Sequence, residues 1–138
     1  MIGLSSSTRY SVAALCELAS LFEGGQFLGV RAIAERRDIP ARYLEQLLAQ
    51  LKQAGLVESA RGPAGGFRLS RPAGDIELLE IIEAVEGPVQ LASGGPCPYD
   101  EVLRRCRDGL RDALRVGLDE LVEAELAHRA GSRMMYHI

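Results

Sequence analysis

The chain has 138 residues, of which 47% are hydrophobic and 25% charged, with a formal net charge of −3. These values indicate one soluble globular domain with room for an appended helix. No stretch approaches the roughly 20 consecutive apolar residues of a membrane span, and no basic segment precedes an apolar run as in a signal peptide, so we expect a cytoplasmic protein.

Two helices are predicted ahead of residue 40. Residues 5–8, SSST, supply N-cap hydroxyls for a helix over residues 9–22, which stops at Gly24 and Gly25. A short second helix covers residues 30–37, VRAIAERR, and the turn RDIP separates it from a third helix. Pro40 fits the first turn of that third helix, where a missing N–H costs nothing.

The third helix is amphipathic and is followed by a predicted hairpin. Its apolar residues recur at the i, i+3, i+4, i+7 spacing of one buried face: Leu44, Leu47, Leu48 and Leu51. The opposite face carries side chains that suit a DNA groove: Arg42, Tyr43, Glu45, Gln46, Gln50 and Lys52. After Gly55, the segments LVES and GFRLS are predicted strands joined by RGPAGG, a wing whose Arg61 could enter a narrow minor groove.

Charge is unevenly distributed along the chain. Residues 31–71 hold eight Lys and Arg against four Asp and Glu, a local +4, and the remainder holds eight against fifteen, a local −7. A basic module on an acidic body is typical of DNA binding, although a chance fluctuation on a solvated surface gives the same count. The order helix, helix, turn, helix and two-stranded wing predicts a winged helix-turn-helix.

The second half of the chain is predicted to be helical. A helix over residues 75–85 is followed by a loop at 87–98, rich in Gly and Pro, and then by one long amphipathic helix from Tyr99 to about His128. The apolar side of this helix is longer than one small domain can cover. We therefore expect a homodimer whose two DNA-binding domains contact a two-fold symmetric site. The residues expected at the dimer interface are Leu110, Leu114, Gly117, Leu118 and Leu121. Gly109 and Gly117 mark either close helix crossings or a kink.

The expected fold is mainly α with a small β-wing. Residues 1–72 form the DNA-binding domain, 73–98 a linking helix and cysteine loop, 99–130 the dimerisation helix, and 131–138 a weakly ordered tail.

This order of motifs resembles the Rrf2 family of bacterial winged-helix repressors, which includes IscR-, NsrR- and CymR-like proteins. The matching segments are SSSTRYSVAALCELA, AIAERRDIPARYLEQLL, LKQAGLVESARGPAGGFRLSRP and IIEAVEGPV. The resemblance implies a dimeric, promoter-binding transcriptional regulator. It places Arg42, Tyr43, Glu45 and Gln46 at the major groove and Arg61 at the minor groove. A solvated helix face and an ordinary hairpin turn are the alternative for these residues.

The resemblance also implies a cysteine-ligated iron-sulfur cluster, but this chain departs from the family pattern. Three cysteines, an odd number, do not make a disulfide framework, so metal binding or redox sensing is expected of them. Many family members carry three clustered cysteines here, whereas this chain has only Cys97 and Cys106. Gly109 and Arg9 stand where family members place a histidine or an aspartate ligand. Two thiolates with two other ligands can still hold a [2Fe-2S] cluster, and the available imidazoles are His128 and His137.

The residues around Cys97 suggest a second possibility. Pro98 and the acidic residues after it predict a helix start with Cys97 at the N-cap, where helix N–H groups activate a thiol. Cys106 would then lie about 13 Å along the axis, beyond the roughly 7 Å between bridged Cα atoms. If residues 98–105 form a loop instead, both thiols can converge on one metal. Inert thiols remain the third alternative, and Cys16 is expected in the core.

The sequence gives less support to two other classes of function than to DNA binding. A winged fold used only for protein interaction is disfavoured by the basic head and the exposed Arg42, Gln46 and Arg61. An enzyme is disfavoured further, because the sequence has no CxxC, no Ser/His/Asp set and no GxxxxGK loop.

Overall fold

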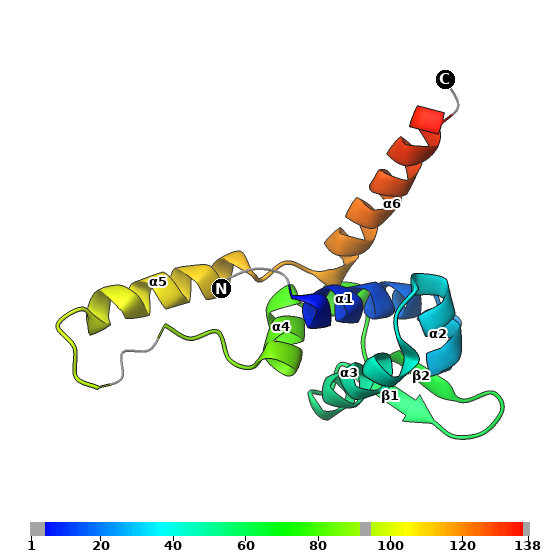
Figure 1. The fold of residues 1–138 in the computed structure, drawn as a ribbon, viewed down its shortest axis with the longest axis horizontal. Coiled ribbons are helices and arrows are strands. Elements are labelled where there is room, and N and C mark those ends of the chain that lie inside the picture. Colours follow the sequence, from blue (N-terminus) through cyan, green and yellow to red (C-terminus); the bar gives the residue numbers. More distant parts are fainter. Residues whose placement is uncertain (1–4, 92–94, 137–138) are drawn as a thin grey trace.

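The computed structural model describes residues 5–91 and 95–136. The elements are α1 (Ser6–Ala19), α2 (Val30–Arg37), α3 (Ala41–Gln53), β1 (Val57–Ala60), β2 (Gly66–Leu69), the 3-10 turn η1 (Ala73–Asp75), α4 (Leu78–Glu86), α5 (Asp100–Ala113) and α6 (Leu118–Tyr136). Helices α1 to α4 and the two strands form the body, from which α5 and α6 extend in different directions (Figure 1). No helix in the described ranges is long and apolar enough to cross a membrane.

The body is built around the leucine stripe of α3. Leu44, Leu48 and Leu51 are fully buried and Leu47 is 2% exposed, which confirms the predicted inward face. Leu44, Leu48 and Leu51 belong to one core cluster with buried residues from other parts of the body: Leu15 and Leu18 of α1, Ile33 of α2, Leu56, Leu69, Ile76, Ile81 and Leu118. Because one face of α3 is fixed in this core, its other face is held toward solvent.

The wing is an antiparallel hairpin, as predicted. Its register pairs Val57 with Leu69 and Ala60 with Gly66. Leu28 adds a bridge to Phe67 through two backbone hydrogen bonds of 2.8 Å. Gly66 has φ +130, and a Cβ there would lie 2.4 Å from the Leu28 carbonyl, so only glycine permits this approach.

Several boundaries in the first half differ from the sequence prediction, among them the end of the first helix, which is Ala19 and not residue 22. Helix α1 begins three residues earlier than expected, because the Ser5 hydroxyl accepts the Thr8 N–H and caps it. Helix α4 begins at Leu78, and not at Asp75, because Glu77 and Glu80 form a capping box there.

The prediction of one continuous helix from Tyr99 to about His128 was wrong. The chain leaves helical geometry between α5 and α6, where it pairs with the segment that leads into α4. The Leu78 N–H donates to the Val116 carbonyl at 2.7 Å, and the Leu118 N–H donates to the Ile76 carbonyl at 2.7 Å. These non-local hydrogen bonds replace the helical ones, so the interruption has a tertiary cause.

The interruption also changes the fate of the predicted dimer residues. Leu118 is fully buried in the core of its own chain, so its assignment to the dimer interface was wrong. Leu121 packs against the same core, and Gly117 lies in the bridge to Glu77. Residues 131–136, which the sequence analysis assigned to a tail, continue α6.

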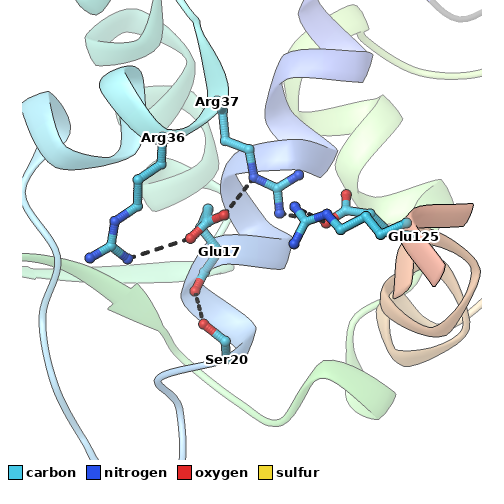
Figure 2. A network of polar contacts seen from close by, with 6 residues as sticks. Glu17, Ser20, Arg36, Arg37 and Glu125 are labelled. Atoms are coloured by element: carbon cyan, nitrogen blue, oxygen red, sulfur yellow. Dashed lines mark hydrogen bonds and ion pairs between the residues drawn. The ribbon is translucent and has the colours of Figure 1, made fainter. Parts of the chain in front are cut away.

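A polar network ties α6 to α1 and α2. The Arg37 guanidinium donates to Glu17 at 2.7 Å and to Glu125 at 2.6 Å, and Arg36 approaches Glu17 at 3.5 Å (Figure 2). The Arg37 side chain is 12% exposed and that of Glu17 is 15% exposed. The end of α2, just before the turn into α3, is therefore held from two sides.

Candidate nucleic-acid interface

The outward face of α3 presents four of the predicted DNA-binding residues to solvent. Arg42, Glu45, Gln46 and Lys52 are all exposed. Within residues 5–91 and 95–136, no hydrogen bond or ion pair engages the side chain of Arg42 or Lys52. Their charges are therefore available to an external anion.

Tyr43 has a different environment. Its side chain is half-buried, its ring meets that of Tyr10 edge-on at 5.7 Å between centroids, and its hydroxyl hydrogen-bonds to the Ser7 hydroxyl. These contacts join the first turn of α3 to α1. Tyr43 therefore positions the start of α3, a role that its sequence position did not reveal.

Arg61 lies at the start of the wing loop. It is exposed, and Gly62 after it has φ +100, which turns the chain away from β1. No ion pair or hydrogen bond holds its side chain within the part of the chain that the structure describes. The wing and α3 lie on the same side of the body, opposite α6 (Figure 1). One surface can therefore present both elements to a single duplex.

The wing is fixed at its base by Arg68. This side chain donates to Glu58 at 3.0 Å and to the Gly25 carbonyl at 3.2 Å, and its guanidinium carbon lies 4.4 Å from the centroid of the Phe27 ring. The sequence analysis did not single out Arg68. Two of its partners, Gly25 and Phe27, lie in a loop more than 40 residues away, and no local pattern marks them.

The eight basic residues within 31–71 fall into two groups, those that form an ion pair and those that do not. Arg36, Arg37, Arg68 and Arg71 each form an ion pair with a carboxylate. The basic residues of this region without such a pair, within the described residues, are Arg31, Arg42, Lys52 and Arg61. Arg31 at the start of α2 is a further exposed cation that the sequence analysis did not single out, although it lies inside the basic region.

The connection between α2 and α3 sets the angle at which α3 projects from the body. Asp38 adopts the left-handed conformation with φ 54, Ile39 behind it is buried, and Pro40 is the N-cap of α3 and not part of its first turn. Asp38 sits next to Arg37, whose ion pairs anchor this corner. The result is the rigid helix-turn-helix joint that projects α3 outward.

Cys16 is a core residue, as expected. It is 5% exposed, and burial, together with the nearby Glu125 carboxylate, raises the pKa of its thiol to about 11. The thiol is therefore protonated at neutral pH and a poor nucleophile.

Cys97 and Cys106 lie outside the body. The N-cap of α5 is Tyr99, so the expected position of Cys97 at the N-cap was wrong. The Tyr99 N–H nevertheless donates to the Cys97 sulfur at 3.4 Å. Cys106 is exposed on α5.

The described residues of one chain do not bring together the donors of a four-ligand iron-sulfur cluster. In residues 5–91 and 95–136, no group of three His, Cys, Asp or Glu side chains could hold a metal ion. His128 is exposed on α6, and His137 lies outside the described residues.

The fold and the reading surface together define a winged helix-turn-helix protein of the DNA-binding class. The sequence model of Rrf2, described as an iron-dependent transcriptional regulator, matches residues 4–129. The chain belongs to this family; it is a DNA-binding transcriptional regulator and not an enzyme.

Named relatives agree with this assignment. The chain is 44% identical over 99 residues to the HTH-type transcriptional regulator IscR of Cereibacter sphaeroides, a match that covers 67% of this chain and 64% of the relative. It is 34% identical over 144 residues to IscR of an Enterobacter species, covering 97% of this chain and 88% of the relative.

Solved structures extend the likeness to the fold. CymR, the global cysteine regulator of B. subtilis, superposes with a TM-score of 0.74 at 31% identity, covering 90% of this chain and 98% of that one. The IscR of T. potens superposes with a TM-score of 0.70 at 31% identity, covering 90% and 88% of the two chains.

Proposed function

We propose that the protein is a homodimeric repressor that binds a two-fold symmetric promoter site. Helix α3 enters the major groove with Arg42, Glu45 and Gln46 facing base edges, and Lys52 contacts a phosphate. Arg61 of the wing enters the minor groove. The observation that carries the proposal is that exposed cations without an ion pair to any described residue lie on α3 and the wing, two elements on one side of the body (Figure 1). A cytoplasmic location follows, because the chromosome of a bacterium lies there.

The second copy packs on α5. No residue of this helix is buried, and Tyr99 and Val102 at its start are 66% and 49% exposed. Leu110, at the expected interface, lies on α5, and Leu114 is its C-cap; both are half-buried. An amphipathic helix that leaves its apolar side open is typical of a dimer interface.

Sensing through Cys97 and Cys106 rests on the description of the family as iron-dependent. Each thiol lies on or beside the dimer helix, so a change there alters the connection between the two heads. Anaerobic purification followed by iron analysis and an absorbance spectrum tests this. Iron that is lost in Cys97→Ala supports metal ligation, whereas iron-free protein whose DNA affinity changes on oxidation supports a thiol sensor.

The DNA-binding proposal is tested with two arginine variants. We expect Arg42→Ala and Arg61→Ala each to weaken binding to a selected duplex by about 1–3 kcal/mol, roughly 5- to 150-fold, because each removes a base or phosphate contact. A gel-shift titration at fixed salt measures this. Arg129→Ala on α6 is the matched control, since it removes the same charge from an exposed side chain on the helix that lies opposite α3 and the wing (Figure 1). Equal affinity of all variants would contradict the proposed reading surface, and a wild-type protein that binds no duplex would favour a protein-interaction module.

A further inference from the structure

Helix α5 is attached to the body mainly at its C-terminal end. There the Leu79 N–H donates to the Leu114 carbonyl at 3.0 Å, next to the bridge between Glu77 and Gly117. Among the described residues, one ion pair accompanies these backbone contacts: the Arg111 guanidinium donates to the Glu83 carboxylate of α4 at 2.8 Å. The rest of α5 extends away from the body (Figure 1).

We infer that the Arg111–Glu83 ion pair is a positioning contact that sets the angle between α5, the proposed dimer helix, and the reading head, which consists of α1 to α4 and the wing. This angle selects the spacing between DNA half-sites. The inference rests on the proposed function, because it requires that α5 joins two chains on one DNA site. Neither residue contacts DNA in this proposal. Both act through the direction of α5.

Helix α5 is long enough for a small change in its angle to alter the spacing between half-sites. Fourteen helical residues extend about 21 Å at 1.5 Å per residue. A swing of about 10° at the base therefore displaces the far end by roughly 3.6 Å, close to the rise of one base pair. Since the partner chain is held on α5, such a swing moves one reading head relative to the other by about one base pair.

The ion pair is placed where it opposes that swing. Arg111 lies in the last turn of α5, and Glu83 lies in the middle of α4, which packs on both α1 and α3. The two side chains are 33% and 27% exposed, so solvent screens them only in part. Their contact adds a second point of attachment beside the backbone bridge. The backbone bridge alone would let α5 rotate relative to the body, whereas two points of attachment fix its direction.

Arg107 provides a matched control on the same helix. It lies one turn before Arg111, and both arginines border the same depression against residues 88–90. However, Arg107 pairs with Asp108, its neighbour on α5, and so does not tie α5 to α4. Substitution of either arginine by glutamine removes one charge, but only Arg111→Gln removes the contact with the body.

The experiment measures spacing preference. Duplexes are selected from a random-sequence pool with the wild-type dimer, and the dissociation constant is then measured for the selected site and for versions with one or two base pairs added or removed between half-sites. We expect Arg111→Gln and Glu83→Gln to reduce the preference for the selected spacing by about three- to fivefold, the effect of a partly exposed ion pair on an equilibrium constant. Arg107→Gln should keep the wild-type preference.

Restoration by charge reversal separates positioning from a general loss of stability. The double variant Glu83→Arg with Arg111→Glu should recover the spacing preference that each single reversal loses. Light scattering confirms that each variant is dimeric. If Arg111→Gln dissociates into monomers, the spacing preference of dimeric Glu83→Gln tests the positioning role in its place: a reduced preference supports the role, and a wild-type preference overturns it.

The possible failures are distinguishable. A dimeric Arg111→Gln with the wild-type spacing profile overturns the positioning role and leaves the proposed function intact. A wild-type protein that is monomeric, or that selects no duplex, overturns the proposed function and this inference with it.

Discussion

At the scale of single residues, the side chains that matter for function divide into those that face outward and those that hold them in place. Arg42 and Arg61 are exposed and unpaired in the described part of the chain, whereas Arg37, with the same side chain, is 12% exposed between two carboxylates. A guanidinium suits both tasks, since its fixed fork of donors binds two acceptors at once. Surroundings alone decide which task each arginine performs.

The Arg37 network predicts a dependence of stability on pH. The hydrogen bond from Arg37 outweighs burial and lowers the pKa of Glu125 below its ordinary value of 4.5. Because the unfolded chain takes up this proton first, the stabilisation is complete above about pH 4.5 and is lost as the pH falls toward the folded pKa. We expect Glu125→Gln to lower the free energy of unfolding at pH 7 by about 1 kcal/mol.

Urea unfolding of wild type and Glu125→Gln at several pH values between 7 and about 3.5 checks this. The difference between the two proteins should shrink as the pH falls. Glu123→Gln is the control, since Glu123 is exposed on the same helix. A difference that stays constant across this range would show that the ionised carboxylate is not what stabilises the network.

At the scale of elements, the apolar stripe of residues 103–122 serves two helices with different tasks. On α5, Leu103 and Leu110 are only half-buried in the single chain. On α6, Leu118 is fully buried, and Leu121 and Val122 pack against the core. We therefore expect the first part of the stripe to pack against a partner chain, whereas the second part completes the body.

Aspartate substitutions should separate these two tasks. Leu118→Asp buries a charge in the core and should lower the free energy of unfolding by more than about 4 kcal/mol. Leu110→Asp should leave a folded chain but convert the dimer to a monomer, because its charge falls in the proposed interface. Circular dichroism melting and light scattering measure the two effects. A stable dimer of Leu110→Asp would exclude α5 as the interface.

At the scale of the whole molecule, an acidic protein presents a basic surface. The net charge is −3, yet the exposed cations of α2, α3 and the wing lie within residues 31–71, where eight basic residues stand against four acidic ones. Half of that region's cations are already in ion pairs within the described residues, so the positive charge offered to DNA is smaller than the sequence count suggests. The acidic remainder repels the duplex and favours one orientation of approach.

This division of charge limits the salt dependence of DNA binding. Arg31, Arg42, Lys52 and Arg61 give at most about eight phosphate contacts per dimer, so the slope of log affinity against log salt should be no steeper than about −7. Titrations between about 50 and 200 mM salt measure the slope. A steeper slope would mean that ion-paired arginines, or those of α5, also contact the phosphates.

The exposed face of α3 and the hairpin turn of the wing were predictable, because their signals are local. The spacing of Leu44, Leu47, Leu48 and Leu51 determines which side of α3 is buried, and therefore that Arg42 and Gln46 face outward. The glycines of RGPAGG mark the hairpin turn for the same reason, since backbone freedom is a property of single residues.

Other features were decided only by tertiary contacts. The sequence from Tyr99 to His128 has the period of one helix, but hydrogen bonds to residues 76–79 interrupt it and draw Leu118 into the core. The roles of Tyr43, Arg68 and Arg111 likewise depend on partners 10 to 43 positions away. Periodicity reports which face of a helix is apolar, whereas the element that covers that face, and the partner of each charge, is chosen when distant segments meet.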